Sequence, residues 1–79
     1  MRLQTYPSLG CVRKAQADRK PIAIVFDSKP ACDAWVTYIR EEGDQTVALL
    51  KVTQTGKKDS PATLSFPEYG KGEPTFAFA

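Results

Sequence analysis

Apolar residues occur along this chain in short runs separated by polar, glycine or proline residues, and each run predicts one element. The most apolar run is at residues 21–26 (PIAIVF), and it is rich in β-branched side chains. A short run without polar alternation is typical of a strand that is covered on both faces. We therefore predict a strand at residues 21–26, in the centre of a sheet.

The next segment has the apolar spacing of a helix. Its apolar residues lie three or four positions apart, as on one face of a helix: Cys32, Trp35, Val36 and Ile39. Either residue of the pair at 27–28 (DS) can cap the helix start, and Pro30 fits the first turn. Gly43 provides an end. The pattern predicts an α-helix at about residues 29–42.

The second half of the chain alternates in the manner of strands. Residues 46–53 and 62–66 each carry apolar side chains at alternate positions, as a strand with one buried face does. Turn-forming residues fill the segment between them, so the two runs predict a hairpin. After a second turn at residues 69–74, alternation resumes at residues 75–79 and predicts a last strand.

The first twenty residues have the weakest pattern. Residues 2–6 alternate weakly, and residues 11–17 fit either a strand or a short helix, with propensity favouring the helix. We favour a strand for residues 11–17, because a second short helix would have no apolar stripe. The fold class that follows is α+β. A single small domain has one α-helix (about residues 29–42) packed on a mostly antiparallel sheet of four to six strands.

The predicted elements place some aromatic residues in the core and leave others as candidates for the protein surface. Five fall on faces that turn inward, and we expect them in the core: Phe26, Trp35, Phe66, Phe76 and Phe78. The three tyrosines, Tyr6, Tyr38 and Tyr69, are candidates for exposure.

Length and composition agree with one small soluble domain. The chain has 79 residues, of which 42% are hydrophobic and 25% charged, with a net charge of +2. No stretch approaches the roughly 20 apolar residues of a membrane span, and the N-terminus has no apolar run of signal-peptide length. We therefore expect a cytoplasmic protein that does not contact a membrane.

The residue types present argue against catalysis. The chain has no histidine, the commonest general base and zinc ligand. Cys11 and Cys32 are too few for a thiolate metal site, and we expect both to be free thiols. The segment 70–72 (GKG) lacks the context of a phosphate-binding loop. We interpret Asp27 as a helix cap, with catalysis by this residue the least favoured alternative. The prediction is a protein that is not an enzyme, with no cofactor and no metal.

Two groups of residues are candidates for binding a partner. Four basic residues lie close together in the sequence: Arg13, Lys14, Arg19 and Lys20. In a hairpin they would gather around one turn, where they either protect a sheet edge from aggregation or contact a partner. Tyr38 and Arg40, on the flank of the predicted helix, form a second candidate contact, because tyrosine and arginine are enriched in interface hot spots.

The favoured function is a noncatalytic protein-binding module, an inhibitor or adaptor that acts by surface complementarity through these six residues. The alternative is a single-stranded nucleic-acid-binding protein. In that case the basic hairpin follows the phosphates, and exposed aromatic side chains near it (Tyr6, Tyr69 or Phe66) stack on the bases. A homodimer formed through a sheet edge is a further alternative.

Overall fold

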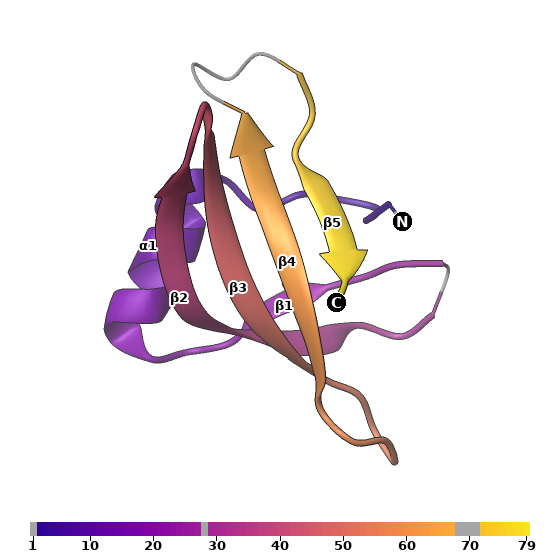
Figure 1. Cartoon of the computed structure of the whole chain (residues 1–79). Helices are drawn as coiled ribbons and strands as arrows, with labels where there is room; N and C mark the ends of the chain where they lie inside the picture. The colour runs from indigo at the N-terminus through magenta and orange to yellow at the C-terminus, as the bar shows by residue number, and fades with distance from the viewer. Residues whose placement is uncertain (1, 28, 68–71) are drawn as a thin grey trace.

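The computed structural model describes residues 2–27, 29–67 and 72–79 (Figure 1). Its elements in chain order are α1 (Leu9–Asp18), β1 (Ile22–Ile24), β2 (Cys32–Glu42), β3 (Gln45–Thr53), β4 (Ser60–Pro67) and β5 (Thr75–Phe78). Each strand pairs antiparallel with the next one along the chain, so the sheet order is β1-β2-β3-β4-β5. The sheet is curled into a half-barrel with α1 packed on it, which confirms the α+β class.

The helix lies at the start of the chain, and the strand predicted for residues 11–17 is wrong. Ser8 caps α1, since its Oγ accepts a hydrogen bond of 3.1 Å from the backbone amide of Cys11. Only Val12 is buried among the residues of α1, so the helix has the weak apolar face that the sequence indicates. End capping and helix-favouring residue types therefore determine its conformation more than a buried stripe does.

The end of α1 is closed by the backbone. The amides of Arg19 and Lys20 donate to the carbonyls of Gln16 and Ala15, at 3.3 and 3.1 Å. These are the paired hydrogen bonds of a Schellman motif, which requires a left-handed residue just after the helix. Arg19 takes that conformation, with φ of 54°.

The predicted helix at residues 29–42 is wrong, because this segment forms the longest strand, β2. Its register with β3 shifts between Val36 and Tyr38, which leaves Thr37 as an extra residue in a bulge. Ala34 and Val36 face inward before the bulge, and Ile39 faces inward after it. The bulge thus places two inward-facing residues, Val36 and Ile39, three positions apart, and this spacing resembles that of a helix.

The apolar run at residues 21–26 forms a strand at one edge of the sheet, and its predicted central position is wrong. β1 pairs only with β2 among the described residues. Beyond β1, Leu3 forms an isolated antiparallel bridge with Phe26, and the amide of Gln4 donates to the carbonyl of Val25 at 2.9 Å. Ile24 and Phe26 are buried among the core residues, and β2 is the one strand that lies beside β1 in the described part of the chain.

The predicted hairpin and last strand are confirmed as β3, β4 and β5, and their inward faces form most of the core. The ring centroid of Phe26 lies 6.1 Å from that of Phe76 and 5.4 Å from that of Phe78. These contacts connect the two edges of the half-barrel across its interior. Phe26, Phe66 and Phe76 are buried and Phe78 is half-buried, as expected, whereas Trp35 is outside the core.

Candidate functional site

The face of the sheet that points away from the core carries two exposed aromatic side chains. Tyr38 is 55% exposed and Trp35 is 36% exposed, and both project from β2. Each lies beside a residue of β3 on the same face, Lys51 next to Trp35 and Leu49 next to Tyr38. We call this area the outer aromatic surface, and it consists of Trp35, Tyr38, Arg40, Val47, Leu49 and Lys51.

The bulge at Thr37 makes this surface possible. Side chains three positions apart on a regular strand point to opposite faces, so Trp35 and Tyr38 would be separated by the sheet. The extra residue brings both rings to the outer face. The hydroxyl of Thr37 donates to the carbonyl of Leu49 at 3.0 Å, which ties the bulge to β3.

The positive charges of the outer aromatic surface lie close to carboxylates. The guanidinium of Arg40 contacts Glu42, with Nη2 3.0 Å and Nε 3.2 Å from Oε2. The ammonium of Lys51 lies 3.9 Å from a carboxylate oxygen of Asp59. These two cations therefore add no surplus positive charge to the face.

A shallow hollow of about 300 Å³ continues the outer aromatic surface toward β4. It is lined by Arg40, Glu42, Gln45, Val47, Thr63 and Ser65. Val47 is only 6% exposed although it faces outward, because the side chains around it cover it. The hollow therefore has polar walls around an apolar floor.

The four basic residues predicted to bind a partner lie around α1. Arg13 and Lys14 are in the helix, Arg19 and Lys20 follow it, and all four are exposed. No hairpin gathers them at a turn, so the predicted basic hairpin is wrong. The guanidinium of Arg13 lies 3.3 Å from the carboxylate of Glu41, which belongs to the inner side of β2.

The structure does not bring all six predicted binding residues together. Tyr38 and Arg40 lie on the outer face of β2, whereas the four basic residues belong to α1 and its end, on the other side of that strand. Trp35, expected in the core, is a surface residue. The β-branched residues Val36, Thr37 and Ile39 in the predicted helix were the signal that favours a strand.

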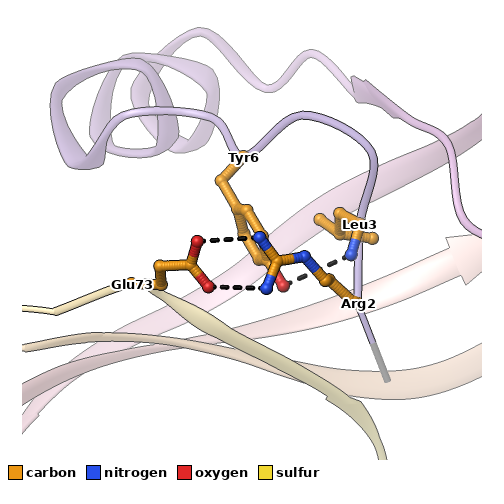
Figure 2. Close-up of polar contacts among 4 residues, drawn as sticks. All are labelled: Arg2, Leu3, Tyr6 and Glu73. Atoms are coloured by element: carbon orange, nitrogen blue, oxygen red, sulfur yellow. Dashed lines mark hydrogen bonds and ion pairs between the residues drawn. The ribbon is translucent and has the colours of Figure 1, made fainter.

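The remaining tyrosines differ from Tyr38. Tyr6 is half-buried, and its hydroxyl accepts a hydrogen bond of 3.3 Å from the amide of Leu3. It lies beside the ion pair of Arg2 and Glu73 (Figure 2), which raises the pKa of the Arg2 guanidinium through hydrogen bonding and charge. Tyr69 lies outside the described residues.

The side chains that could act in catalysis or bind a metal ion do not form a common site among the described residues. Asp27 caps no helix, since β2 follows it, and it occupies a turn with a left-handed φ of 50°. Cys11 and Cys32 are both free thiols, in agreement with the sequence prediction. Within residues 2–27, 29–67 and 72–79, no three His, Cys, Asp or Glu side chains are grouped so that they could hold a metal ion.

Comparison with protein-family models, with curated proteins and with solved structures found no match to this chain. Among the described residues, no helix has both the length and the apolar character needed to span a membrane.

Proposed function

We propose that this protein is a noncatalytic protein-binding module, an inhibitor or adaptor, and that the outer aromatic surface is its contact site. The observation that carries the proposal is the exposure of Trp35 and Tyr38 on a sheet face that no described element covers. Tryptophan, tyrosine and arginine are the residues most enriched in interface hot spots. Arg40 supplies the third of these types, two positions after Tyr38.

The charge of this surface favours a protein partner over the alternative, a single-stranded nucleic acid. A single-strand site combines stacking aromatic rings with surplus positive charge that follows the phosphates. Arg40 and Lys51 lie next to carboxylates, and the basic residues around α1 lie away from the exposed rings. The two components of such a site are therefore separated on this molecule.

Site-specific crosslinking in the cells that make the protein tests the proposal. A photoreactive phenylalanine analogue replaces Tyr38 in one variant and Lys14, on α1, in a second. A third variant carries it at Lys58, an exposed control position. We expect a discrete crosslinked protein from position 38 and none from positions 14 or 58.

A double substitution determines whether the crosslinked partner depends on the aromatic rings. Trp35→Thr with Tyr38→Thr should keep the circular dichroism spectrum and weaken partner binding at least tenfold. Lys14→Gln with Lys20→Gln is the matched control and should leave the affinity unchanged. The proposal fails if the folded aromatic variant binds with unchanged affinity, or if crosslinks form only from position 14.

Titration of labelled single-stranded DNA and RNA tests the alternative directly. Binding that weakens steeply as salt is raised, and that Lys14→Gln with Lys20→Gln abolishes, would favour a nucleic-acid-binding protein. Under the proposal we expect no binding at physiological salt.

A further inference from the structure

A second hollow lies at the end of the sheet where the β1–β2 and β3–β4 loops meet. It has a volume of about 220 Å³ and is lined by residues 29–31 of the first loop, by Cys32 at the start of β2, and by Gln54, Thr55 and Lys57 of the second loop. At about 30 Å³ per water molecule, this is the volume of roughly seven waters, so the hollow suits a small molecule. It is separate from the outer aromatic surface, since the two share no residue.

Both loops contribute a positive charge to the lining. Lys29 belongs to the first loop and Lys57 to the second, and the described residues that line the hollow include no aspartate or glutamate. Within the described part of the chain, neither ammonium has a carboxylate at ion-pair distance. Asp59, the nearest acidic residue in sequence to Lys57, instead lies by Lys51 and accepts a hydrogen bond from Thr53.

The two lysines are attached to backbone that the fold constrains. The amide of Lys29 donates to the carbonyl of Phe26 at 3.1 Å, and its ammonium lies 5.9 Å from the centre of the Phe26 ring, a cation–π contact. The amide of Lys57 donates to the carbonyl of Gln54 at 3.1 Å, which closes a turn at Gly56. Local contacts therefore fix the backbone of both lysines at the hollow.

The rest of the lining combines apolar surface with hydrogen-bond donors. Pro30, Ala31 and Cys32 provide apolar surface, and the thiol of Cys32 is half-buried and lies 3.6 Å from the carbonyl of Pro30. The amide of Gln54 and the hydroxyl of Thr55 can each donate a hydrogen bond to an anion. Two cations, neutral donors and an apolar wall are the features that recognise an anion with a short hydrocarbon body.

We propose that this hollow binds a small organic anion. Its carboxylate or phosphate group lies between the ammonium groups of Lys29 and Lys57, and its apolar body packs against Pro30 and Cys32. The site is independent of the protein contact proposed above.

Four six-carbon probes separate charge from apolar character in an amide-resolved NMR titration of the full chain: hexanoate, hexyl phosphate, hexylammonium and hexanol. We expect saturable shifts with an anionic probe at the amides of Ala31, Cys32, Thr55 and Lys57. Whichever of hexanoate and hexyl phosphate binds more tightly identifies the anionic group. Equal shifts with hexylammonium or hexanol, or no saturation with either anion, would overturn the proposal.

Substitutions then test the two lysines. Lys29→Gln and Lys57→Gln should each weaken binding of the better anion at least fivefold. Lys14→Gln and Lys20→Gln, which remove equally exposed charges at α1, should leave it unchanged. If all four variants weaken binding equally, the affinity for the anion depends only on the net charge of the protein. The proposed site between Lys29 and Lys57 is then disproved.

The thiol of Cys32 gives a readout that does not depend on chemical shifts. In a Cys11→Ser background, Cys32 is the single cysteine, and its alkylation by a maleimide can be timed. A bound anion should slow alkylation at least threefold, whereas hexylammonium should not. Alkylation at the same rate with and without a saturating anion would contradict the placement of the ligand against Cys32.

Discussion

The guanidinium of Arg2 and the carboxylate of Glu73 form a two-bonded ion pair between residues that are 71 positions apart (Figure 2). Nη1 and Nη2 each donate to one carboxylate oxygen, at 2.7 Å in both cases. Arg2 precedes Leu3, which bridges to Phe26, and Glu73 precedes β5. The pair therefore joins the two sides of the half-barrel where the described strands have no backbone pairing between them.

Arg2→Gln should loosen this side of the molecule without unfolding it. The ion pair is solvent-exposed, and such pairs contribute little to global stability. We expect an unchanged urea midpoint but several-fold faster hydrogen exchange at Gln4, whose amide donates to the carbonyl of Val25. Arg40→Gln removes a different exposed ion pair and is the control, with no change expected at Gln4. Unaltered exchange at Gln4 in Arg2→Gln would show that the ion pair does not hold the N-terminal segment.

Phe76→Ala should remove much of the stability of the protein. Phe76 is fully buried and its ring contacts those of Phe26 and Phe78, at centroid distances of 6.1 and 5.3 Å. Truncation of a buried phenylalanine costs about 3 to 5 kcal/mol, a large part of the total for a small domain. Urea unfolding measures the loss. The neighbouring exposed residue provides the control, since Thr75→Ala should change stability by less than about 0.5 kcal/mol.

The sequence predicted β3, β4 and β5 because alternation is regular there and each strand has one buried face. It failed at β2, where the bulge at Thr37 interrupts the period of two. It also failed at α1, where capping by Ser8 and the closing bonds of Arg19 and Lys20 replace an apolar stripe. Periodicity detects burial, and it gives no signal for a helix that buries a single side chain.

As with the fold, the sequence identified some of the candidate binding residues and not others. Tyr38 and Arg40 were identified by residue type, and both are exposed in the structure. Trp35 could not be placed, because its face depends on the conformation of the whole segment. The hollow between Lys29 and Lys57 could not be predicted either, since it needs the pairing of β2 with β3 to bring two separate loops together.

A change in side-chain size should affect the stability of the protein less at Trp35 than at Ala34. Trp35 is on the outer face, so Trp35→Thr should alter stability by less than about 1 kcal/mol, with threonine favoured in a strand. Ala34 is fully buried on the inner face, and Ala34→Leu should destabilise by about 1 to 3 kcal/mol through overpacking. Urea midpoints of the two variants provide the comparison. A loss of about 3 kcal/mol or more in Trp35→Thr would place the indole in the core and contradict the outward orientation.

Deletion of Thr37 should leave the inner and outer faces of β2 unchanged, because Thr37 is the extra residue relative to β3. Without Thr37, Val36 and Tyr38 become consecutive residues opposite Leu50 and Leu49, so every side chain of β2 keeps its present face and we expect the variant to fold. Thr37→Val keeps the β-branched shape but loses the hydrogen bond to the carbonyl of Leu49, at a cost of about 1 kcal/mol. Circular dichroism and urea unfolding separate the two effects. A deletion variant that does not fold would show that the curled sheet needs the local bend of the bulge in addition to the burial pattern.

Arg19→Gly should stabilise the protein, although arginine is the larger residue. The position has φ of 54°, a conformation that costs a residue with a Cβ about 1 kcal/mol relative to glycine. The two hydrogen bonds that close α1 come from backbone amides and remain in the variant. We expect a gain of about 1 kcal/mol in the free energy of unfolding, measured from urea curves at constant slope.

Lys20→Gly is the matched control for Arg19→Gly. It removes a charge of the same sign one position later, where the backbone is not left-handed, and should leave stability unchanged or lower. A lower urea midpoint in Arg19→Gly would mean that the arginine side chain contributes more than its backbone strain costs. The affinity of Arg19→Gly for the partner shows whether its change in stability affects binding. Because the proposed contact is on the outer aromatic surface, the more stable Arg19→Gly variant should bind the partner with unchanged affinity.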